Sequence, residues 1–470
     1  MSAGAVPIDA ARTPRRPEPA PLFDRPWVRG GLPGPLSHEL LARQEARESS
    51  ARSYPRRLPI AIARAAGAYV QDLDGNVFID FLNGAGSLPL GHSHPELVEA
   101  IERQLPLFQH GLDLPTEVRE EFASAQLSLL PAEMRERTKI GFCGSTGANA
   151  VEAALKLCKT ATGRSEVIAF QGGYHGGSHG AMAVSALVSQ KERVAGQMPG
   201  VHFFPFPYPL RGPIADGPGC VEYLERSLRD PLGGIARPAA VILEVIQGEG
   251  GVIPAPPEFV HGVRRVTREL GIPLIADEIQ CGFGRSGRWF AFEQHGIAPD
   301  VILASKGIGG LGMPISIIMF DERLDAWAAG AHTGTFRGNQ LAFAAGVAAV
   351  KIIERDGILE NVRELGAAAL AALEELAGEF AFVAQARGAG LMLGLELIEP
   401  DSGAPDGAAA AAVQRAALQR GLIVELGGRE DAVIRLLPPL NVTRRTLDQA
   451  LAILREALSA VQQDQAARRA

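Results

Sequence analysis

Two short apolar segments of this sequence each end in a residue that could take part in catalysis. Residues 272–284 deliver the carboxylate of Asp277, and residues 301–310 deliver the amine of Lys306 just before a glycine-rich turn. Each segment has the length and composition of a buried strand, and ligands bind at the carboxyl ends of parallel strands. A carboxylate beside a pyridinium nitrogen and a lysine for a Schiff base are what pyridoxal 5′-phosphate (PLP) chemistry needs. The alternatives are a buried ion pair or two unrelated strand ends.

A second candidate feature is a turn of small residues, 143–149, between an expected strand and an expected helix. The backbone N–H groups of Gly147 and Ala148 can approach an anion closely there, and the positive end of the helix dipole favours negative charge. Thr146 would add a hydroxyl donor. The same residues also suit an ordinary helix N-cap in a tight turn. No Gly-Lys-Ser/Thr follows, so this is not a nucleoside triphosphate loop.

A third feature is a glycine-flanked turn that carries Tyr174 and His175 after the next expected strand. A planar cofactor needs a ring to stack on, which Tyr174 could supply; the alternative is a half-buried tyrosine in a surface turn. The spacings of His92, His94, His175 and His179 fit no standard zinc pattern, so the sequence predicts no metal site.

Composition places the chain among globular proteins and argues against some partners. At 470 residues it is too long for one simple core, and its 46% hydrophobic and 21% charged content is ordinary. A net charge of -7 argues against nucleic acid or an anionic membrane as a partner. We expect neither a membrane span nor a secretory signal, because no apolar run has the required length or position. Four scattered cysteines favour a reduced, cytoplasmic setting.

The candidate residues need a parallel sheet to bring them together, and the middle of the chain has the pattern for one. From about residue 95 to 330, apolar strand candidates alternate with amphipathic helices, which predicts an α/β fold with a mostly parallel sheet covered on both faces. Strands are expected at residues 140–143, 166–170, 240–244, 273–277, 300–304 and 315–320, the last of which could be an antiparallel addition.

The rest of the chain is expected to form an arm and a smaller domain. Residues 1–35 are rich in Pro, Ala, Gly and Arg and predict a flexible arm, or one lying on a neighbour. Residues 36–90 hold a helical pattern and a hairpin with an Asp-Gly-Asn turn. We expect them to join residues 346–470 in a smaller α+β domain, beside a large domain of residues 91–345.

Taken in order, the motifs resemble the fold-type I, class III aminotransferases over nearly the whole chain after about residue 50. The motifs are Gly91-His-Ser-His-Pro, Thr146-Gly-Ala-Asn-Ala, Tyr174-His-Gly, Glu244-Val-Ile-Gln-Gly-Glu-Gly-Gly, Asp277-Glu-Ile-Gln, Ser305-Lys-Gly, Gly334-Thr-Phe-Arg-Gly-Asn and Arg435-Leu-Leu-Pro-Pro-Leu. Within the class the chain is most similar to the 2,4-diaminobutyrate:2-oxoglutarate 4-aminotransferases, in residues 145–157, 331–340 and 425–429. The resemblance implies the PLP-dependent transferase fold, with a sheet of the seven-stranded type in the large domain.

The resemblance also implies a cofactor site. Lys306 would bind PLP as a Schiff base and then shuttle the substrate proton, and Asp277 would keep the pyridine nitrogen protonated. The remaining positions are Tyr174 against the ring, Gln280 at the phenolic oxygen, Thr146, Gly147 and Ala148 at the phosphate, and His175 and Glu244. Thr335 matches a position that completes the phosphate site of the other subunit, which implies a homodimer with shared active sites.

For the substrates, Arg435 matches an arginine that binds the α-carboxylate of glutamate and 2-oxoglutarate. Glu249 matches a carboxylate that neutralises this arginine and swings away when 2-oxoglutarate arrives, and Tyr54 matches a substrate-contacting aromatic residue. Without the resemblance, Glu249 would suit a hydrogen bond to its glycine-rich turn and Arg435 a strand-end salt bridge. Near Ala85 the family often has an aromatic residue that this chain lacks, which fits a polar diamino acid.

The implied reaction is a reversible ping-pong transfer of the 4-amino group of L-2,4-diaminobutyrate to 2-oxoglutarate, giving L-aspartate 4-semialdehyde and L-glutamate. One alternative is another ω-amino acid or diamine aminotransferase, of the ornithine, acetylornithine or GABA type. A second is a class III aminomutase or racemase, which needs no second keto acid and so would not need Glu249 and Arg435. A third is an inactive PLP-binding module, against which Lys306 argues.

Overall fold

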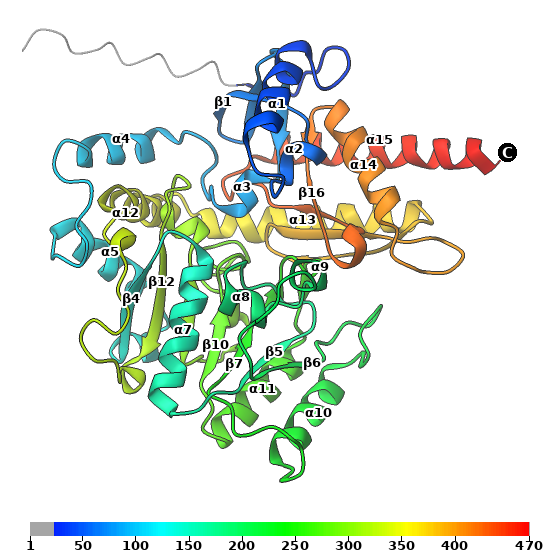
Figure 1. The fold of residues 1–470 in the computed structure, drawn as a ribbon. Coiled ribbons are helices and arrows are strands. Elements are labelled where there is room, and N and C mark those ends of the chain that lie inside the picture. The colour runs from blue at the N-terminus through cyan, green and yellow to red at the C-terminus, as the bar shows by residue number, and fades with distance from the viewer. Residues whose placement is uncertain (1–22, 470) are drawn as a thin grey trace, which may run out of the picture.

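A seven-stranded sheet forms the centre of the structure, a computed structural model that describes residues 23–469 (Figure 1). The sheet has the order β4-β12-β11-β10-β7-β5-β6. Its strands are β4 (Thr138–Gly144), β5 (Val167–Phe170), β6 (Val201–Phe204), β7 (Ala240–Leu243), β10 (Leu274–Asp277), β11 (Val301–Ala304) and β12 (Ser316–Asp321). The pairs among β6, β5, β7, β10 and β11 are parallel, whereas β12 is antiparallel to both of its neighbours. The predicted mostly parallel sheet is confirmed.

The last predicted strand, β12, is antiparallel as expected, and it lies inside the sheet between β4 and β11. One detail of the sheet differs from the expectation: the edge strand β6 was not predicted. Its four residues lead directly into Pro205, and proline-rich sequence argues against a strand when only local pattern is considered.

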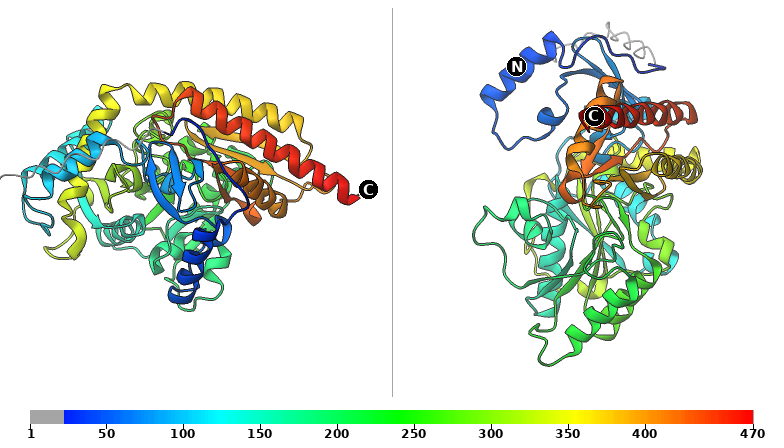
Figure 2. Two further views of the ribbon diagram at one scale, coloured as in Figure 1. Left: turned by 90° about the horizontal axis from the view of Figure 1, so that it is seen from above. Right: turned by 90° about the vertical axis from the view of Figure 1, so that its right-hand side faces the viewer.

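Helices cover both faces of the sheet, which explains why its strands are apolar on both sides. Ile242, Ile275 and Leu303 pack with the buried face of α7 (Gly147–Thr162) in one core cluster. Their chain neighbours point to the opposite face, into the core that includes α11 (Pro257–Glu269) and α12 (Gln340–Arg355). The two layers are visible on either side of the sheet in Figure 2.

A second sheet, of the order β13-β14-β17-β16, lies in the C-terminal part of the chain. Its strands are β13 (Val383–Ala389), β14 (Met392–Leu397), β16 (Glu425–Gly427) and β17 (Val433–Leu436), and all its pairs are antiparallel. The helices of this part are α13 (Ile358–Glu379), α14 (Gly407–Gln419) and α15 (Arg444–Arg469). Helices α13 and α15 run side by side in both views of Figure 2.

The N-terminal segment is tied to the C-terminal segment by a third sheet, β1-β2-β3-β15. It contains β1 (Ile62–Ala66), β2 (Tyr69–Asp72), β3 (Val77–Asp80) and β15 (Leu422–Ile423). The predicted hairpin is confirmed by the antiparallel pairing of β2 with β3, and β15 adds to β3 in parallel. The proposed domain boundaries stay a prediction, which this pairing supports. Of the predicted arm, residues 1–22 lie outside the described part of the chain, and Trp27 forms a bridge with Val77.

Shorter elements complete the described chain. The helices are α1 (Pro35–Arg47), α2 (Tyr54–Arg57), α3 (Asn83–Gly86), α4 (Pro95–Gln104), α5 (Glu117–Ser128), α6 (Ala132–Arg135), α8 (His179–Val184), α9 (Val188–Lys191) and α10 (Gly217–Arg229). The remainder are β8 (Ile246–Gln247), β9 (Ile253–Pro254) and the 3-10 turns η1 (Ala291–His295), η2 (Lys306–Gly309), η3 (Glu322–Leu324), η4 (Thr335–Arg337) and η5 (Arg429–Asp431). Among residues 23–469, no helix combines the length and apolarity needed to cross a bilayer.

Candidate active site

Asp277 and Lys306 lie at the same edge of the central sheet. Asp277 is the last residue of β10, and Lys306 comes two residues after the end of β11. These strands are parallel neighbours in which Asp277 is paired with Leu303. The fold therefore brings the acid and the amine to adjacent strand ends, as the sequence pattern predicts.

Lys306 combines a strained backbone with an amine that has lost part of its basicity. Its φ of 47° lies in the left-handed region, which residues other than glycine rarely occupy. Burial lowers the pKa of the Lys306 amine, and the positive charge of Arg435 adds to this effect while Glu249 opposes it. A lysine with a lowered pKa has a larger neutral fraction and is a better nucleophile toward a carbonyl.

Asp277 is held in place by a buried imidazole. Nδ1 of His175 lies 2.7 Å from Oδ2 of Asp277, and the backbone N–H of Ile279 donates to Oδ1 at 3.1 Å. Burial alone would lower the pKa of His175, but the hydrogen bond to Asp277 and the charges of Asp277 and Glu244 raise it overall. The pair is a fixed acceptor of the kind that a protonated pyridine nitrogen requires.

Glu244, at the end of β7, organises the turn that carries Tyr174. Its Oε1 accepts the N–H of Tyr174 at 2.7 Å and its Oε2 accepts the N–H of Gly248 at 3.0 Å. Burial raises the pKa of Glu244 to about 7, with the charge of Asp277 adding to the rise. In this structure the carboxylate contacts backbone, so it positions Tyr174, which lines the cavity entered by Lys306.

The start of α7 forms a turn of small residues next to the Asp277 loop that is suited to binding an anion. Thr146 is the N-cap, and the first N–H groups of a helix have no partner within the helix. A Cβ on Gly147 would lie 2.9 Å from the side chain of Ile279, and one on Gly176 would lie 2.7 Å from Cβ of Ala148. The small residues thus let three loops meet at the positive end of a 16-residue helix.

The set of residues at these strand ends allows a test of whether the site suits PLP. The fixed carboxylate of Asp277, the amine of Lys306 and the N–H groups at the start of α7 match the pyridine nitrogen, the aldehyde and the phosphate of this cofactor. Gln280, in the loop after Asp277, has its amide against the backbone of Gly248, where a Cβ would collide with it. Its Oε1 is buried and has no hydrogen-bond partner among the described residues. The residues present therefore fit this cofactor.

A buried ion cluster forms another wall of the cavity. The side chain of Arg435, in β17, is fully buried, and its two terminal nitrogens lie 2.9 and 2.8 Å from the carboxylate oxygens of Glu249. Burial would lower the pKa of Arg435, but Glu249 and Glu425 together raise it. Burial would also raise the pKa of Glu249, yet the charges of Arg435 and Lys306 lower it overall. Both groups are therefore charged at neutral pH.

Glu425 is a member of this cluster that sequence reasoning did not assign to the site. Its Oε2 lies 3.0 Å from Nη2 of Arg435, and its Oε1 accepts a hydrogen bond from the hydroxyl of Tyr54 at 3.0 Å. Burial raises the pKa of Tyr54, and Glu425 adds to the rise. The sequence feature that could have indicated it is a glutamate within the apolar run 422–426, at the start of the 425–429 motif.

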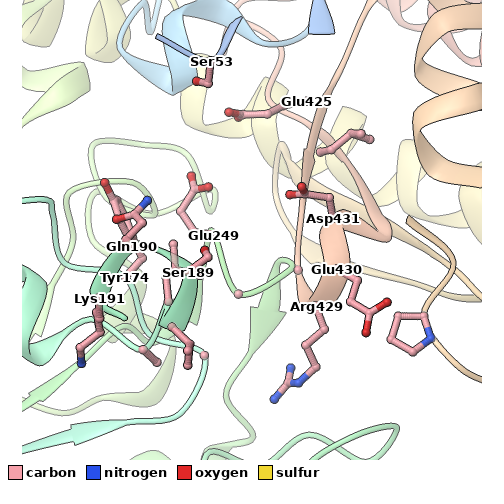
Figure 3. A pocket seen from close by; sticks show the side chains of 18 of the residues that line it. Ser53, Tyr174, Ser189, Gln190, Lys191, Glu249, Glu425, Arg429, Glu430 and Asp431 are labelled. Carbon is pink, nitrogen blue, oxygen red and sulfur yellow. The ribbon is translucent and has the colours of Figure 1, made fainter. Parts of the chain in front are cut away.

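The cavity has a volume of about 1580 Å³ and is lined by residues from the central sheet and from both terminal segments. Figure 3 shows Tyr174 and Glu249 on one side, Glu425 above them, and Arg429, Glu430 and Asp431 opposite. Ala85 lines it where the family often has an aromatic ring. Thr335 is exposed in η4 and lies outside the lining, and no hydrogen bond among the described residues joins its side chain to the other predicted site residues.

Comparisons with known proteins agree with this geometry. The family described as "Aminotransferase class-III" matches residues 50–458. A diaminobutyrate–2-oxoglutarate aminotransferase of Rhizobium meliloti is 49% identical over 426 residues, covering 87% of this chain and 90% of the relative. One of Haemophilus influenzae is 43% identical over 429 residues, covering 88% and 93%.

Solved structures show the same fold. An amine transaminase from an uncultivated Pseudomonas species, in a PLP-bound form, has a TM-score of 0.80 at 28% identity and covers 88% of this chain and 98% of that one. The ornithine aminotransferase of Toxoplasma gondii has a TM-score of 0.79 at 27% identity, covering 91% and 96%.

Proposed function

Since this chain belongs to the class-III aminotransferases, we propose that it moves the 4-amino group of L-2,4-diaminobutyrate to 2-oxoglutarate. The products are L-aspartate 4-semialdehyde and L-glutamate, and the reaction is reversible. The observation that carries the proposal is the bidentate ion pair between Arg435 and Glu249 in the cavity that Lys306 enters. The names of the similar R. meliloti and H. influenzae enzymes support the choice of amino donor.

PLP is the cofactor of this class, and when bound it supplies an electron sink for the carbanion that forms at the substrate carbon. We assign Asp277 to the pyridine nitrogen, where its hydrogen bond with His175 fixes the carboxylate. The other assignments are Tyr174 against the ring, Gln280 at the phenolic oxygen, and Thr146, Gly147 and Ala148 at the phosphate. Glu244 supports this arrangement through the backbone of Tyr174.

Lys306 attaches the cofactor and moves the substrate proton. Its lowered pKa leaves a neutral amine more readily available, and such an amine can accept a proton from C4 of the donor. Lys306 lies just after β11 with a φ of 47°, so the fold holds the backbone that carries this amine in an uncommon conformation.

Arg435 and Glu249 let one cavity accept two unlike substrates. With the amino donor bound, Glu249 neutralises the buried guanidinium, which would otherwise be a costly unpaired charge. When 2-oxoglutarate enters, its α-carboxylate takes the place of Glu249 and makes the same two-pronged contact with Arg435. Glu249 can move because its side chain keeps 27% of its surface exposed, whereas that of Arg435 is fully buried.

We further propose a homodimer with shared active sites. Apolar side chains are exposed around η4 and the loop between α4 and α5: Leu105, Leu107, Phe108, Leu112, Leu114 and Phe336. The loop is joined to η4 by the Gly111 N–H, which donates to the Gly338 carbonyl at 2.8 Å. An exposed apolar patch of this kind is typical of an interface. Thr335 lies outside the lining of its own cavity. If this patch packs on a second copy, Thr335 would come next to the phosphate site of that copy.

A cytoplasmic location completes the proposal, supported by the finding that all four cysteines are free and buried thiols. No observation favours ornithine or 4-aminobutyrate over diaminobutyrate as the amino donor. An aminomutase or racemase would not require the Arg435–Glu249 pair.

A panel of amino donors tests the proposal. Glutamate formation from 2-oxoglutarate would be measured with 2,4-diaminobutyrate, ornithine, N-acetylornithine and 4-aminobutyrate at equal concentrations. We expect 2,4-diaminobutyrate to give the highest kcat/KM and aspartate 4-semialdehyde to form in step with glutamate. A higher kcat/KM for another donor, or amino-group migration without any keto acid, would contradict it.

A further inference from the structure

We propose that Glu425 binds the ammonium group on the α-carbon of the donor, which is not transferred, and so selects diamino acids over amino acids with a single distal amine. This inference rests on the proposed function and deepens it. Glu425 lines the same cavity as Lys306, where the distal amine reacts, and Figure 3 shows its carboxylate at the cavity wall.

The Glu425 carboxylate has one oxygen that is occupied and one that is available. The residue is 9% exposed in β16, and the Tyr54 hydroxyl donates to its Oε1. Its Oε2 is buried and forms no hydrogen bond to any residue that the structure describes, although Nη2 of Arg435 lies 3.0 Å away. A buried carboxylate oxygen without a donor is unfavourable, and an ammonium group with three N–H donors would satisfy it.

The charges around Glu425 also favour a cation. Two carboxylates, Glu249 and Glu425, face one guanidinium, and Glu249 already uses both of its oxygens on Arg435. Burial raises the pKa of Glu425 and the negative charge of Glu249 adds to the rise, and together they outweigh Arg435, Tyr54 and Lys306, which lower it. An α-ammonium group would supply the missing positive charge. 4-Aminobutyrate has no such group, so its binding would leave Oε2 of Glu425 without a hydrogen-bond donor.

The Glu425→Gln variant tests the proposal, because it keeps the shape and the hydrogen bond to Tyr54 but removes the charge. Each half-reaction of the PLP-loaded enzyme would be followed separately by the change in cofactor absorbance after rapid mixing. We expect kcat/KM for 2,4-diaminobutyrate to fall roughly 10- to 100-fold, as for a lost charged hydrogen bond, and that for 4-aminobutyrate to change less than about threefold. The half-reaction of 2-oxoglutarate should not weaken, since a negative charge beside Arg435 is removed.

Equal losses for the two donors would mean that Glu425 only supports Arg435, and an unchanged preference would mean that the α-ammonium binds elsewhere; either result overturns the proposal. Glu430→Gln, an exposed acid of the same cavity lining, is the matched control and should leave the preference unchanged. If Glu425→Gln does not fold, Glu425→Asp serves as the second variant. It keeps the charge and should retain the preference for 2,4-diaminobutyrate over 4-aminobutyrate. Loss of this preference in the Asp variant would contradict the proposal. Failure of the unaltered enzyme to use 2,4-diaminobutyrate would instead refute the proposed function.

Discussion

The Nδ1 atom of His175 lies 2.7 Å from Oδ2 of Asp277, and neither side chain is more than 4% exposed. The two residues are 102 positions apart and reach each other because the strands that precede them, β5 and β10, belong to the same parallel sheet. The imidazole contacts one oxygen of the carboxylate and the Ile279 N–H donates to the other, so the plane of the carboxylate is fixed from both sides.

Replacing Asp277 by asparagine should reduce kcat by about 10²–10³-fold. The amide keeps the volume and a hydrogen bond to His175, but it cannot stabilise a protonated pyridine nitrogen. The measurement is steady-state turnover with 2,4-diaminobutyrate, together with the amount of PLP bound after gel filtration. A variant that binds PLP and turns over at nearly the original rate would refute the role assigned to Asp277.

Replacing Arg435 by glutamine should weaken the half-reaction of 2-oxoglutarate by about 100-fold and that of the diamine much less. The reason is that only the keto acid displaces Glu249 and pairs with the guanidinium of Arg435. Single-turnover kinetics of the two half-reactions measure the difference. Arg57→Gln is the matched control, because Arg57 lines the same cavity but pairs with Asp431 at 2.6 Å. Equal losses in the two half-reactions of the Arg435 variant would remove the exchange mechanism.

Glu396 should make stability dependent on pH on the acid side. This 1% exposed carboxylate pairs with Arg387 and Arg211, each at 2.6 Å, and accepts a hydrogen bond from Tyr208. Burial alone would raise its pKa, but Arg387, Tyr208 and Arg211 together lower it. Because the folded pKa lies below the unfolded value of about 4.3, its stabilisation is present above that value and is lost as the pH falls through the folded pKa.

The test of this dependence is urea unfolding of the original chain and of Glu396→Gln at a series of pH values from about 3 to about 7. The variant should be about 3–5 kcal/mol less stable at neutral pH, because the buried guanidinium of Arg387 and the partly buried one of Arg211 lose their charged partner. The difference should shrink toward the acid end. A constant difference across the whole range would show that Glu396 acts through packing rather than charge.

Phe336→Asp should weaken the homodimer and lower activity at the same time. The side chain is 68% exposed beside Thr335, so a carboxylate there would have to be buried against the second copy. Sedimentation equilibrium would give the dimer constant, and activity would be measured across the same concentrations. Leu232→Asp, at a 90% exposed position after α10, is the control and should change neither. A Phe336 variant that stays dimeric and active would place the interface elsewhere.

Local sequence pattern was enough to place several of the proposed site residues at the ends of strands and helices. Asp277 and Lys306 follow apolar runs that a buried strand explains, and the Asp-Gly-Asn turn marks the hairpin of β2 and β3. Such features depend on residues close together in the chain, so they can be read before any fold is known. The turn at Gly147, which we propose binds the phosphate, belongs to the same group, because a strand, small residues and a helix are adjacent in sequence.

Contacts between distant segments had no local signal. Tyr54 and Glu425 are 371 positions apart, and nothing in either neighbourhood indicates the other. The two-residue strand β15 is too short to show periodicity, and only its pairing with β3 defines it. Glu425 therefore remained one residue of a motif until the fold placed it beside Arg435.

The parallel pairing of β15 with β3 has a consequence for how the molecule is made. During synthesis on the ribosome, β3 leaves the exit tunnel more than 300 residues before its neighbour does. Until β15 is made, the nascent N-terminal hairpin has an open edge, and an open edge of this kind favours aggregation. Glu425 and Arg435 emerge just after β15, so their part of the cavity wall cannot form before the strand that closes this sheet has been made.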